Sequence, residues 1–281
     1  MARNVALRPK TRLAVHRRIA LGTWSPPDDP TVHGTLKLPV GPMQAYLKAV
    51  REATGQRVTL TVALAKAMGI VLREVPDSNV IIRWGKLYLR DDVDIFVHVA
   101  MIDPKTGKHD LSGIKLHHVD QRSITDLARQ LETSAAVVRQ DKDPTMAASR
   151  RMMRATPQWL VRFALSFLAF VSYTLNINPK MFGAPRDPFG SVGITNVGSL
   201  GLDTAYVPLV PYSRLPIFLA LGAVQEEAVV KDGIVTVAEM VGVHATFDHR
   251  ILDGAHVGQM TDILRRIFAD PTAAFGPPEG A

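Results

Sequence analysis

The sequence predicts a layered α/β domain, because segments with helical spacing of apolar residues interleave along the chain with segments of strand-like pattern. Apolar residues recur at helical spacing across 60–71 and alternate in part across 87–101, around Asp91-Asp92. A third stretch, 218–237, predicts a hairpin that turns at Lys231-Asp232-Gly233. The 281 residues are 47% hydrophobic and 21% charged, an ordinary globular composition that can bury a sizeable core.

The remaining elements each have a local signal. Pro76 follows the expected end of the first long helix, and Ser123 with Asp126 resembles a capping box at the start of another. The other expected elements are a short strand at 114–116, an amphipathic helix with Ile124, Leu127, Leu131 and Val138 on one face, a buried strand at 191–197, a strand at 241–247 that runs towards His249, and a helix at 255–268 with Met260, Leu264 and Ile267 on one face.

Charge and cysteine content narrow the possible functions. The chain has 33 Lys and Arg against 26 Asp and Glu, and the formal net charge of +7 suits an anionic partner. No finger, basic-zipper or RNA-binding motif accompanies this charge, so we expect no nucleic acid. The absence of cysteine excludes a disulfide framework, a thiolate zinc site and a cysteine nucleophile.

The chain is expected to form a basic N-terminal arm over 1–24 and a single domain over 25–281. The arm lacks the apolar run of a secretory signal, so the expected location is the cytoplasm. The most apolar stretch, Trp159 to Ile177, is interrupted by Arg162 and is shorter in its uninterrupted part than the roughly 20 residues that a spanning helix needs. We therefore expect a buried or interfacial helix there.

The candidate catalytic residue is His249, in the stretch Thr246-Phe247-Asp248-His249-Arg250-Ile251-Leu252-Asp253-Gly254. It stands at the end of a predicted strand, where a side chain can leave the core and reach a cleft. A histidine suits general-base chemistry, since its ordinary pKa of about 6.5 leaves a neutral imidazole available. Asp253 is close enough to help shape the turn, and Gly254 lets the chain turn before the next helix. From spacing alone, a structural histidine held by a nearby acid fits equally well.

Asp-His-Arg-x-x-Asp-Gly at 248–254 resembles the active-site signature of the acyltransferase (E2) subunits of 2-oxo acid dehydrogenase complexes, whose catalytic domains share a fold with chloramphenicol acetyltransferase. The related condensation domains of peptide synthetases have two adjacent histidines, whereas this chain has Asp248 in the first of those places. Further similarity lies in Gly193 to Gly198, in Pro208 to Gly222, in Arg17-Arg18-Ile19-Ala20, in Thr59 to Pro76 and in Asp94 to Met101. The resemblance implies a two-layer α/β sandwich with a mixed sheet.

The resemblance also implies a role for each matching residue. His249 matches the catalytic base, and Thr195 matches the hydroxyl residue that stabilises the oxyanion. Asp253 matches a structural acid that pairs with an N-terminal arginine, for which we choose Arg18 and then Arg17. The loop that holds Thr195 is shaped by Asn196 and Gly198, and Gly254 closes the signature. Without the resemblance, Thr195 fits better as an ordinary β-branched strand residue.

The implied reaction transfers an acyl group between coenzyme A and a thiol acceptor such as dihydrolipoamide, with no metal. Two alternatives stay open: an amine or hydroxyl acceptor, with a long acyl chain among the possible substrates, and a non-catalytic scaffold that forms a trimer or shell. The family forms homotrimers with active sites between subunits, and the trimers assemble further into cages through an apolar C-terminal anchor. Here only Phe275 resembles such an anchor, which weakens the case for a cage, so we expect a trimer before a cage.

Several segments depart from the family pattern. The chain shows neither a lipoyl domain nor a subunit-binding domain, so if it uses lipoamide, a separate lipoyl-carrier protein is expected as the partner that supplies it. Trp159 to Ile177, preceded by Arg150, Arg151 and Arg154, replaces a short polar link. It is interpreted as an extra helix on the sheet or at an interface, with a wall for a long acyl chain or a surface on anionic lipid as the alternatives. His117-His118 with Asp120 fits ordinary strand histidines better than a metal site.

Overall fold

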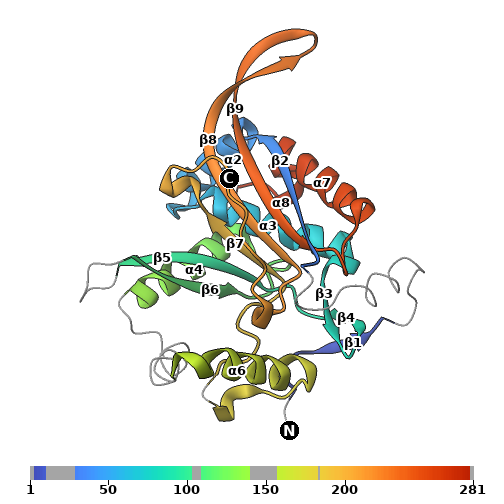
Figure 1. The fold of residues 1–281 in the computed structure, drawn as a ribbon. Coiled ribbons are helices and arrows are strands. Elements are labelled where there is room, and N and C mark those ends of the chain that lie inside the picture. Colours follow the sequence, from blue (N-terminus) through green and yellow to red (C-terminus); the bar gives the residue numbers. More distant parts are fainter. Residues whose placement is uncertain (1–2, 11–28, 103–108, 140–156, 183, 279–281) are drawn as a thin grey trace.

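A six-stranded mixed sheet is the frame of the molecule, which a computed structural model describes over residues 3–10, 29–102, 109–139, 157–182 and 184–278 (Figure 1). The strands lie in the order β2-β9-β8-β7-β5-β6. β7 runs parallel to both of its neighbours, and the other pairs are antiparallel. The strands are β2 (Thr31–Pro39), β5 (Ile95–Ile102), β6 (His109–Leu116), β7 (Val192–Asn196), β8 (Ile217–Lys231) and β9 (Ile234–Asp248).

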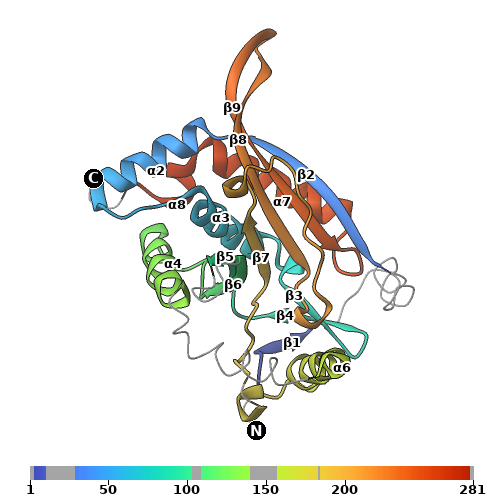
Figure 2. The same ribbon diagram turned by 60° about the vertical axis from the view of Figure 1, so that its left-hand side comes forward.

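Helices cover one face of this sheet (Figure 2). Helix α3 contacts β7, α4 contacts β6 and α7 contacts β2, so the two layers enclose one continuous apolar core. The predicted two-layer α/β sandwich with a mixed sheet is therefore confirmed. The helices are α2 (Gly41–Thr54), α3 (Leu60–Glu74), α4 (Ile124–Arg139), α7 (Gly254–Ala269) and the short α8 (Pro271–Phe275).

The predicted helix boundaries follow from side-chain caps. The Thr59 hydroxyl accepts the backbone N–H of Val62 at the start of α3, and that helix ends before Pro76 as expected. At the start of α4, the backbone N–H of Asp126 donates to the Ser123 hydroxyl at 3.2 Å, which is one half of the predicted capping box. These caps satisfy backbone donors that the first helical turn leaves unpaired.

The predicted hairpin and the predicted strand towards His249 are continuous: together they form the two long paired strands β8 and β9. β8 and β9 pair from Ile217–Phe247 to Lys231–Ile234, with a register shift between Leu221 and Val224. Their outer parts extend beyond the sheet as a two-stranded ribbon (Figure 1). The turn is at Asp232-Gly233, as predicted, and both residues have positive φ angles, as a type I′ turn requires.

A second, three-stranded sheet has the order β1-β4-β3, with β1 (Leu7–Pro9), β3 (Val80–Arg83) and β4 (Lys86–Arg90). The apolar stretch predicted over Trp159 to Ile177 packs here, and not on the main sheet. It forms α6 (Gln158–Ala169) and a π-helical turn, Phe170–Thr174. Ala169 and Tyr173 share a separate small core with Val5 and Ile81. None of the described helices is both long and apolar enough to cross a bilayer.

Part of the segment predicted to be an exposed arm, residues 3–10, is instead packed. β1 pairs with β4, and both Asn4 and Val5 are buried. The Asn176 side-chain amide donates to the Val5 carbonyl oxygen and accepts the Val5 backbone N–H, both at 2.6 Å. The apolar Val5 and Leu7 within the basic run explain this difference, since both join the small core. The rest of the predicted arm lies outside the described residues.

A buried ion pair joins the two sheets. The Arg90 guanidinium on β4 contacts the Asp187 carboxylate at 2.8 Å, and their side chains are 3% and 10% exposed. Asp187 lies in the loop that leads into β7, and its backbone N–H donates to the Asn4 side chain. Removing one partner would leave the other charge buried without compensation, which is far more costly than losing an exposed pair.

We expect Asp187→Asn to lower the free energy of unfolding by about 3 kcal/mol, because Arg90 would stay buried without its counter-charge. Asparagine tolerates the positive φ of this residue, so backbone strain is not added. The matched control is Asp91→Asn, whose exposed contact with Arg8 at 3.8 Å should contribute less than about 1 kcal/mol. Urea unfolding of both variants measures the difference, and equal small losses would contradict a structural role for the buried pair.

Candidate active site

The signature turn begins where β9 ends and is held by backbone hydrogen bonds. The N–H of His249 donates to the Pro30 carbonyl oxygen at 2.8 Å, next to the start of β2. Within the turn, the N–H groups of Ile251 and Leu252 both donate to the Asp248 carbonyl oxygen, at 2.9 and 3.0 Å. The backbone of the candidate base is therefore fixed on both sides.

The His249 imidazole is oriented by its own turn. Nδ1 lies 2.7 Å from the Leu252 carbonyl oxygen. A carbonyl oxygen can only accept, so Nδ1 carries the proton in this bond, and in the neutral ring Nε2 then holds the lone pair. A neutral imidazole whose tautomer is fixed in this way is equipped to take a proton at Nε2.

Asp248 and Arg250 on either side of the histidine hold each other. Arg250 donates from Nε to both Asp248 carboxylate oxygens, at 3.0 and 3.2 Å, and from one terminal nitrogen at 2.7 Å. The Arg250 backbone N–H also donates to Asp248. Both side chains are largely buried, so this forked pair supports the turn from one side.

Asp253 caps the helix that follows. Its carboxylate accepts the backbone N–H groups of Ala255 and His256, both at 3.1 Å, and the ring Nδ1–H of His256 at 2.6 Å. The His256 Nε2 atom lies 3.8 Å from the Asp77 carboxylate. The predicted partners Arg18 and Arg17 lie outside the described residues. The contact of His256 was not predicted, although its spacing of three from an N-cap aspartate could have suggested it.

The prediction that Gly254 makes the turn is wrong. Gly254 is the first residue of α7, and its φ is not positive. The chain instead changes direction through the hydrogen-bonded turn before Asp253, which is itself extended. A Cβ atom at Gly254 would meet nothing within 4 Å. The fold of this chain alone therefore does not require glycine at this position.

Thr195 lies near the end of β7, on the sheet face opposite the helices. Ile194 beside it points into the helix-covered core, and side chains alternate along a strand. The next residue, Asn196, donates to the Thr61 hydroxyl at 3.1 Å and accepts the Ser199 backbone N–H at 3.0 Å. A Cβ atom at Gly198 would come within 2.5 Å of the Gly222 carbonyl oxygen. Asn196 and Gly198 thus hold the loop behind Thr195 close to β8.

His98 is a neighbour of Thr195 that sequence analysis missed. The pairing of Val97 with Ile194 places the next residues, His98 and Thr195, side by side on the sheet face opposite the helices. The His98 ring packs against Phe96 and Phe218, with ring centroids 5.3 and 5.1 Å apart. Burial among these aromatic rings lowers the pKa of His98, which favours its neutral form.

Within one chain, His249 and Thr195 are far apart. Val192, Ile217 and Phe247 lie side by side across three strands, and Thr195 is three residues further along β7. His249 lies two residues beyond Phe247 in the opposite direction. Five residue steps correspond to roughly 16 Å along the strands. A reacting carbonyl must lie about 3 Å from both groups, so a single chain does not bring them into one site.

A second polar group on the same face, the buried His244, fixes the loop between β7 and β8. His244 Nε2 donates to the Asp203 carbonyl oxygen at 2.7 Å, and its Nδ1 lies 2.9 Å from the Thr35 hydroxyl. The Tyr206 hydroxyl lies 2.6 Å from Thr35 Oγ1. A Cβ atom at Gly242 would come within 2.6 Å of the His244 ring, so glycine makes room for it. Strand alternation from Asp248 could have placed His244 on this face.

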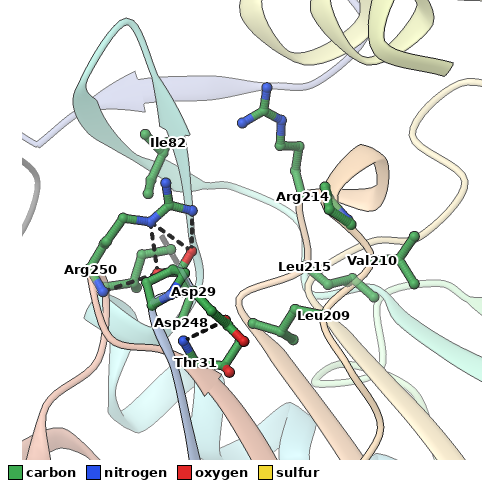
Figure 3. A pocket seen from close by; sticks show the side chains of 12 residues that line it. Asp29, Thr31, Ile82, Leu209, Val210, Arg214, Leu215, Asp248 and Arg250 are labelled. Atoms are coloured by element: carbon green, nitrogen blue, oxygen red, sulfur yellow. Dashed lines mark hydrogen bonds and ion pairs between the residues drawn. The ribbon is translucent and has the colours of Figure 1, made fainter. Parts of the chain in front are cut away.

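A cavity of about 350 Å³ lies beside the signature turn (Figure 3). Asp248 and Arg250 line one side, Arg214 lies across from Arg250, and Ile251 is a further lining residue. Arg214 has a positive φ, and its Nε is buried without a hydrogen-bond partner among the described residues. Burial, and then the charge of Arg250, lower the pKa of Arg214. The other lining residues are Asp29, Pro30, Thr31, Ile82, Leu209, Val210, Pro211 and Leu215.

The histidine pair His117-His118 follows β6 and does not lie in a strand as predicted. His117 Nδ1 lies 3.3 Å from the Asp94 carboxylate, and His118 Nδ1 lies 3.7 Å from Asp92. Burial raises the pKa of Asp94, but the contacts with His117 and Lys115 outweigh it and lower the pKa overall. Among the described residues, no group of three or more His, Asp or Glu is placed to hold a metal ion.

The fold places the chain in a defined structural class. The chloramphenicol acetyltransferase structure matches with a TM-score of 0.54 at 13% identity, covering 94% of this chain and 100% of that one. A probable dihydrolipoamide acetyltransferase from Listeria monocytogenes matches with a TM-score of 0.64 at 15% identity, over 98% and 97%. The Azotobacter vinelandii dihydrolipoamide acetyltransferase matches with a TM-score of 0.63 at 20% identity, over 92% and 86%. The chain therefore has the chloramphenicol acetyltransferase-like fold of acyltransferase cores.

Sequence comparison points to the family. Residues 189–275 match the model of the 2-oxoacid dehydrogenases acyltransferase catalytic domain. The acetyltransferase component of the Bacillus subtilis pyruvate dehydrogenase complex is 34% identical over 89 residues, which are 31% of this chain and 20% of that protein. The Acholeplasma laidlawii counterpart is 25% identical over 228 residues, which are 80% of this chain and 33% of that protein. The predicted resemblance to this family is confirmed, and the chain spans a third or less of these relatives' length.

Replacing Gly198 and Gly254 by alanine should have different effects on the stability of the protein. We expect Gly198→Ala to lower the free energy of unfolding by about 1 to 3 kcal/mol, because the new methyl group would overlap backbone atoms of Gly222 and Ala223. Gly254→Ala should leave stability unchanged or raise it by up to about 1 kcal/mol, since the methyl group meets open space and a helical φ is compatible with alanine. Chemical denaturation of both variants measures this, and a strongly destabilised Gly254→Ala would contradict the structure.

Proposed function

We propose that the chain is an acyltransferase that moves an acyl group between coenzyme A and a thiol acceptor such as dihydrolipoamide, with His249 as the general base. The observation that carries this proposal is the 2.7 Å contact between His249 Nδ1 and the Leu252 carbonyl oxygen, which leaves the lone pair on Nε2. The proposal is also supported by the relatives, which are acetyltransferase components of the pyruvate dehydrogenase complex.

The spacing of the candidate site residues agrees with that in a structurally similar acyltransferase. In the Azotobacter vinelandii dihydrolipoamide acetyltransferase, the catalytic mechanism has been investigated at a serine, a histidine and an asparagine, the last two spaced by four residues. This chain has His249 and Asp253 at the same spacing of four, and Thr195 offers the hydroxyl that serine offers there. Asp253 acts through the start of α7, which it caps, and not on the reacting atoms.

The reaction then follows from these groups. Nε2 of neutral His249 removes the proton from the attacking thiol, and the thiolate forms a bond to the carbonyl carbon of the acyl thioester. The carbonyl oxygen becomes an oxyanion, to which the Thr195 hydroxyl donates a hydrogen bond; one such donor is worth about 3 kcal/mol of barrier. The intermediate then expels the other sulfur, which takes the proton back from the imidazolium, so protons and electrons balance.

We further propose that the hydroxyl comes from a neighbouring copy of the chain. Thr195 and His249 of one chain are too far apart to share a substrate, whereas a rotationally symmetric homotrimer can place His249 of each subunit against Thr195 of the next. A trimer is proposed as the working state. Phe275, the candidate anchor for a larger cage, has its ring centroid 5.8 Å from that of Tyr46 in its own chain.

The chemical class of the acceptor can be tested with a panel of short and long acyl-coenzyme A thioesters. Each thioester is offered with dihydrolipoamide, with an amine or with an alcohol as the acceptor, and the transferred acyl group is measured. Transfer to dihydrolipoamide supports the thiol acceptor, whereas transfer only to the amine or the alcohol would replace it. No transfer from any thioester would favour a scaffold.

We expect His249→Ala to reduce the rate of transfer by about 10²- to 10⁴-fold, because the thiol would lose its general base. Thr195→Ala should reduce kcat by about 10²- to 10³-fold, and Thr195→Ser should retain most activity because it keeps the hydroxyl. The matched control is His118→Ala, an exposed histidine outside the site that should leave the rate unchanged. Release of free coenzyme A thiol measures the rate, and equal rates for His249→Ala and the parent chain would end the proposal.

A further inference from the structure

Helix α6 presents a stripe of aromatic side chains to solvent. Trp159, Phe163, Phe167 and Phe170 follow one another at intervals of three or four residues, so they lie along one face of the helix and its π-helical continuation. Trp159 is 74% exposed, Phe163 is 66% exposed and Phe167 is 57% exposed. Large apolar side chains that gather on one exposed face mark an interaction surface.

The same helix has a separate inner face that already packs. Ala169 and the following Val171 and Tyr173 are buried, and α6 contacts the short 3-10 helix Pro211–Ser213. The aromatic stripe is therefore not the face that attaches α6 to the protein. Helix α6 itself lies at the end of the molecule that carries the small sheet, away from the β8–β9 ribbon (Figure 1).

Trp84 extends the stripe from another element. It lies in the turn between β3 and β4, is 62% exposed, and its ring meets that of Phe170 edge-on with centroids 5.9 Å apart. Trp84 and Gly85 both have positive φ angles. A tryptophan in this backbone conformation is uncommon and energetically unfavourable, and here it directs the indole outwards next to α6. We call Trp84, Trp159, Phe163, Phe167 and Phe170 the aromatic surface.

The segments that build the aromatic surface contain basic residues, and the acidic partners of two of them, Asp91 for Arg8 and Asp77 for Lys10, lie just outside these segments. The described stretches 3–10, 80–90 and 157–182, which build this end of the protein, contain no Asp or Glu. Their basic residues are Arg3, Arg8, Lys10, Arg83, Lys86, Arg90, Arg162 and Lys180. Arg90 is buried against Asp187, but Arg3, Lys86, Arg162 and Lys180 are exposed. Arg162 is one helical turn from Trp159, so charge lies directly beside the exposed rings.

We propose that the aromatic surface docks on an anionic phospholipid bilayer, lying in the interface with its basic neighbours among the headgroups. Exposed Trp and Phe side chains on an amphipathic helix insert at the boundary between headgroups and acyl chains, and each basic residue near an anionic surface adds attraction. A second copy of this same end would instead bring like charges together. The contact is peripheral, and it places the acyltransferase fold at a lipid surface whatever acceptor the active site uses.

Flotation with vesicles tests the proposal on the full chain. The parent protein should float with vesicles of equal parts phosphatidylcholine and phosphatidylglycerol at low salt, and far less with phosphatidylcholine alone or at high salt. Trp159→Glu combined with Phe163→Glu should weaken binding by about tenfold or more, because it removes apolar contact and adds repulsion. Glutamate is a good helix former, so α6 should persist, which circular dichroism checks.

The matched control is Val235→Glu combined with Val237→Glu on the β8–β9 ribbon, where both valines are similarly exposed. This control variant introduces the same two negative charges at a site away from the aromatic surface, so it should bind vesicles as the parent protein does. A parent protein that does not float with anionic vesicles would overturn the proposal, as would a folded Trp159→Glu, Phe163→Glu variant that floats equally well. If that variant changes the oligomer mass while the parent ignores vesicles, the surface is a subunit contact instead.

Discussion

The register of β9 between β2 and β8 determines where the functional side chains of this protein lie. β9 is paired on both sides, so its alternation is fixed: Val243, Ala245 and Phe247 enter the helix-covered core, and His244 and Asp248 face the other way. A slip by one residue would exchange these two sets and turn the polar side chains into the apolar core, away from the hydrogen-bond partners that they have on the other face. The strand then delivers His249 into a turn whose carbonyl group selects the tautomer of the imidazole. Strand pairing and the orientation of the candidate base are thus parts of one constraint.

Much of this arrangement could be predicted because it depends on residues that are close together in the sequence. The apolar spacing of α3, the turn at Asp232-Gly233 and the strand that runs to His249 each follow from a few neighbouring residues. The signature at 248–254 indicated the family, since its residue types and spacing are specific. The role of Asp253 as a helix cap was not predicted, although an aspartate just before a helix start is a common N-cap.

What could not be predicted depends on contacts between distant segments. Nothing near Leu7 indicates that it pairs with Arg90, and nothing near α6 indicates that it would pack on a second sheet. The neighbourhood of His98 and Thr195 needs the parallel pairing of β5 and β7, which local patterns do not specify. Gly254 was assigned to the turn because glycine often serves there, but the turn closes through backbone hydrogen bonds before it.

The central claim is that each reaction centre needs a base from one chain and a hydroxyl from another, and mixing two inactive variants tests it directly. His249→Ala and Thr195→Ala chains are unfolded together, refolded as mixed trimers, and assayed for acyl transfer. Random assembly pairs an intact His249 with an intact Thr195 at about a quarter of the subunit boundaries, so about a quarter of the parental rate should return. If the mixed trimers stay as inactive as the separate variants, no intersubunit site of this kind exists.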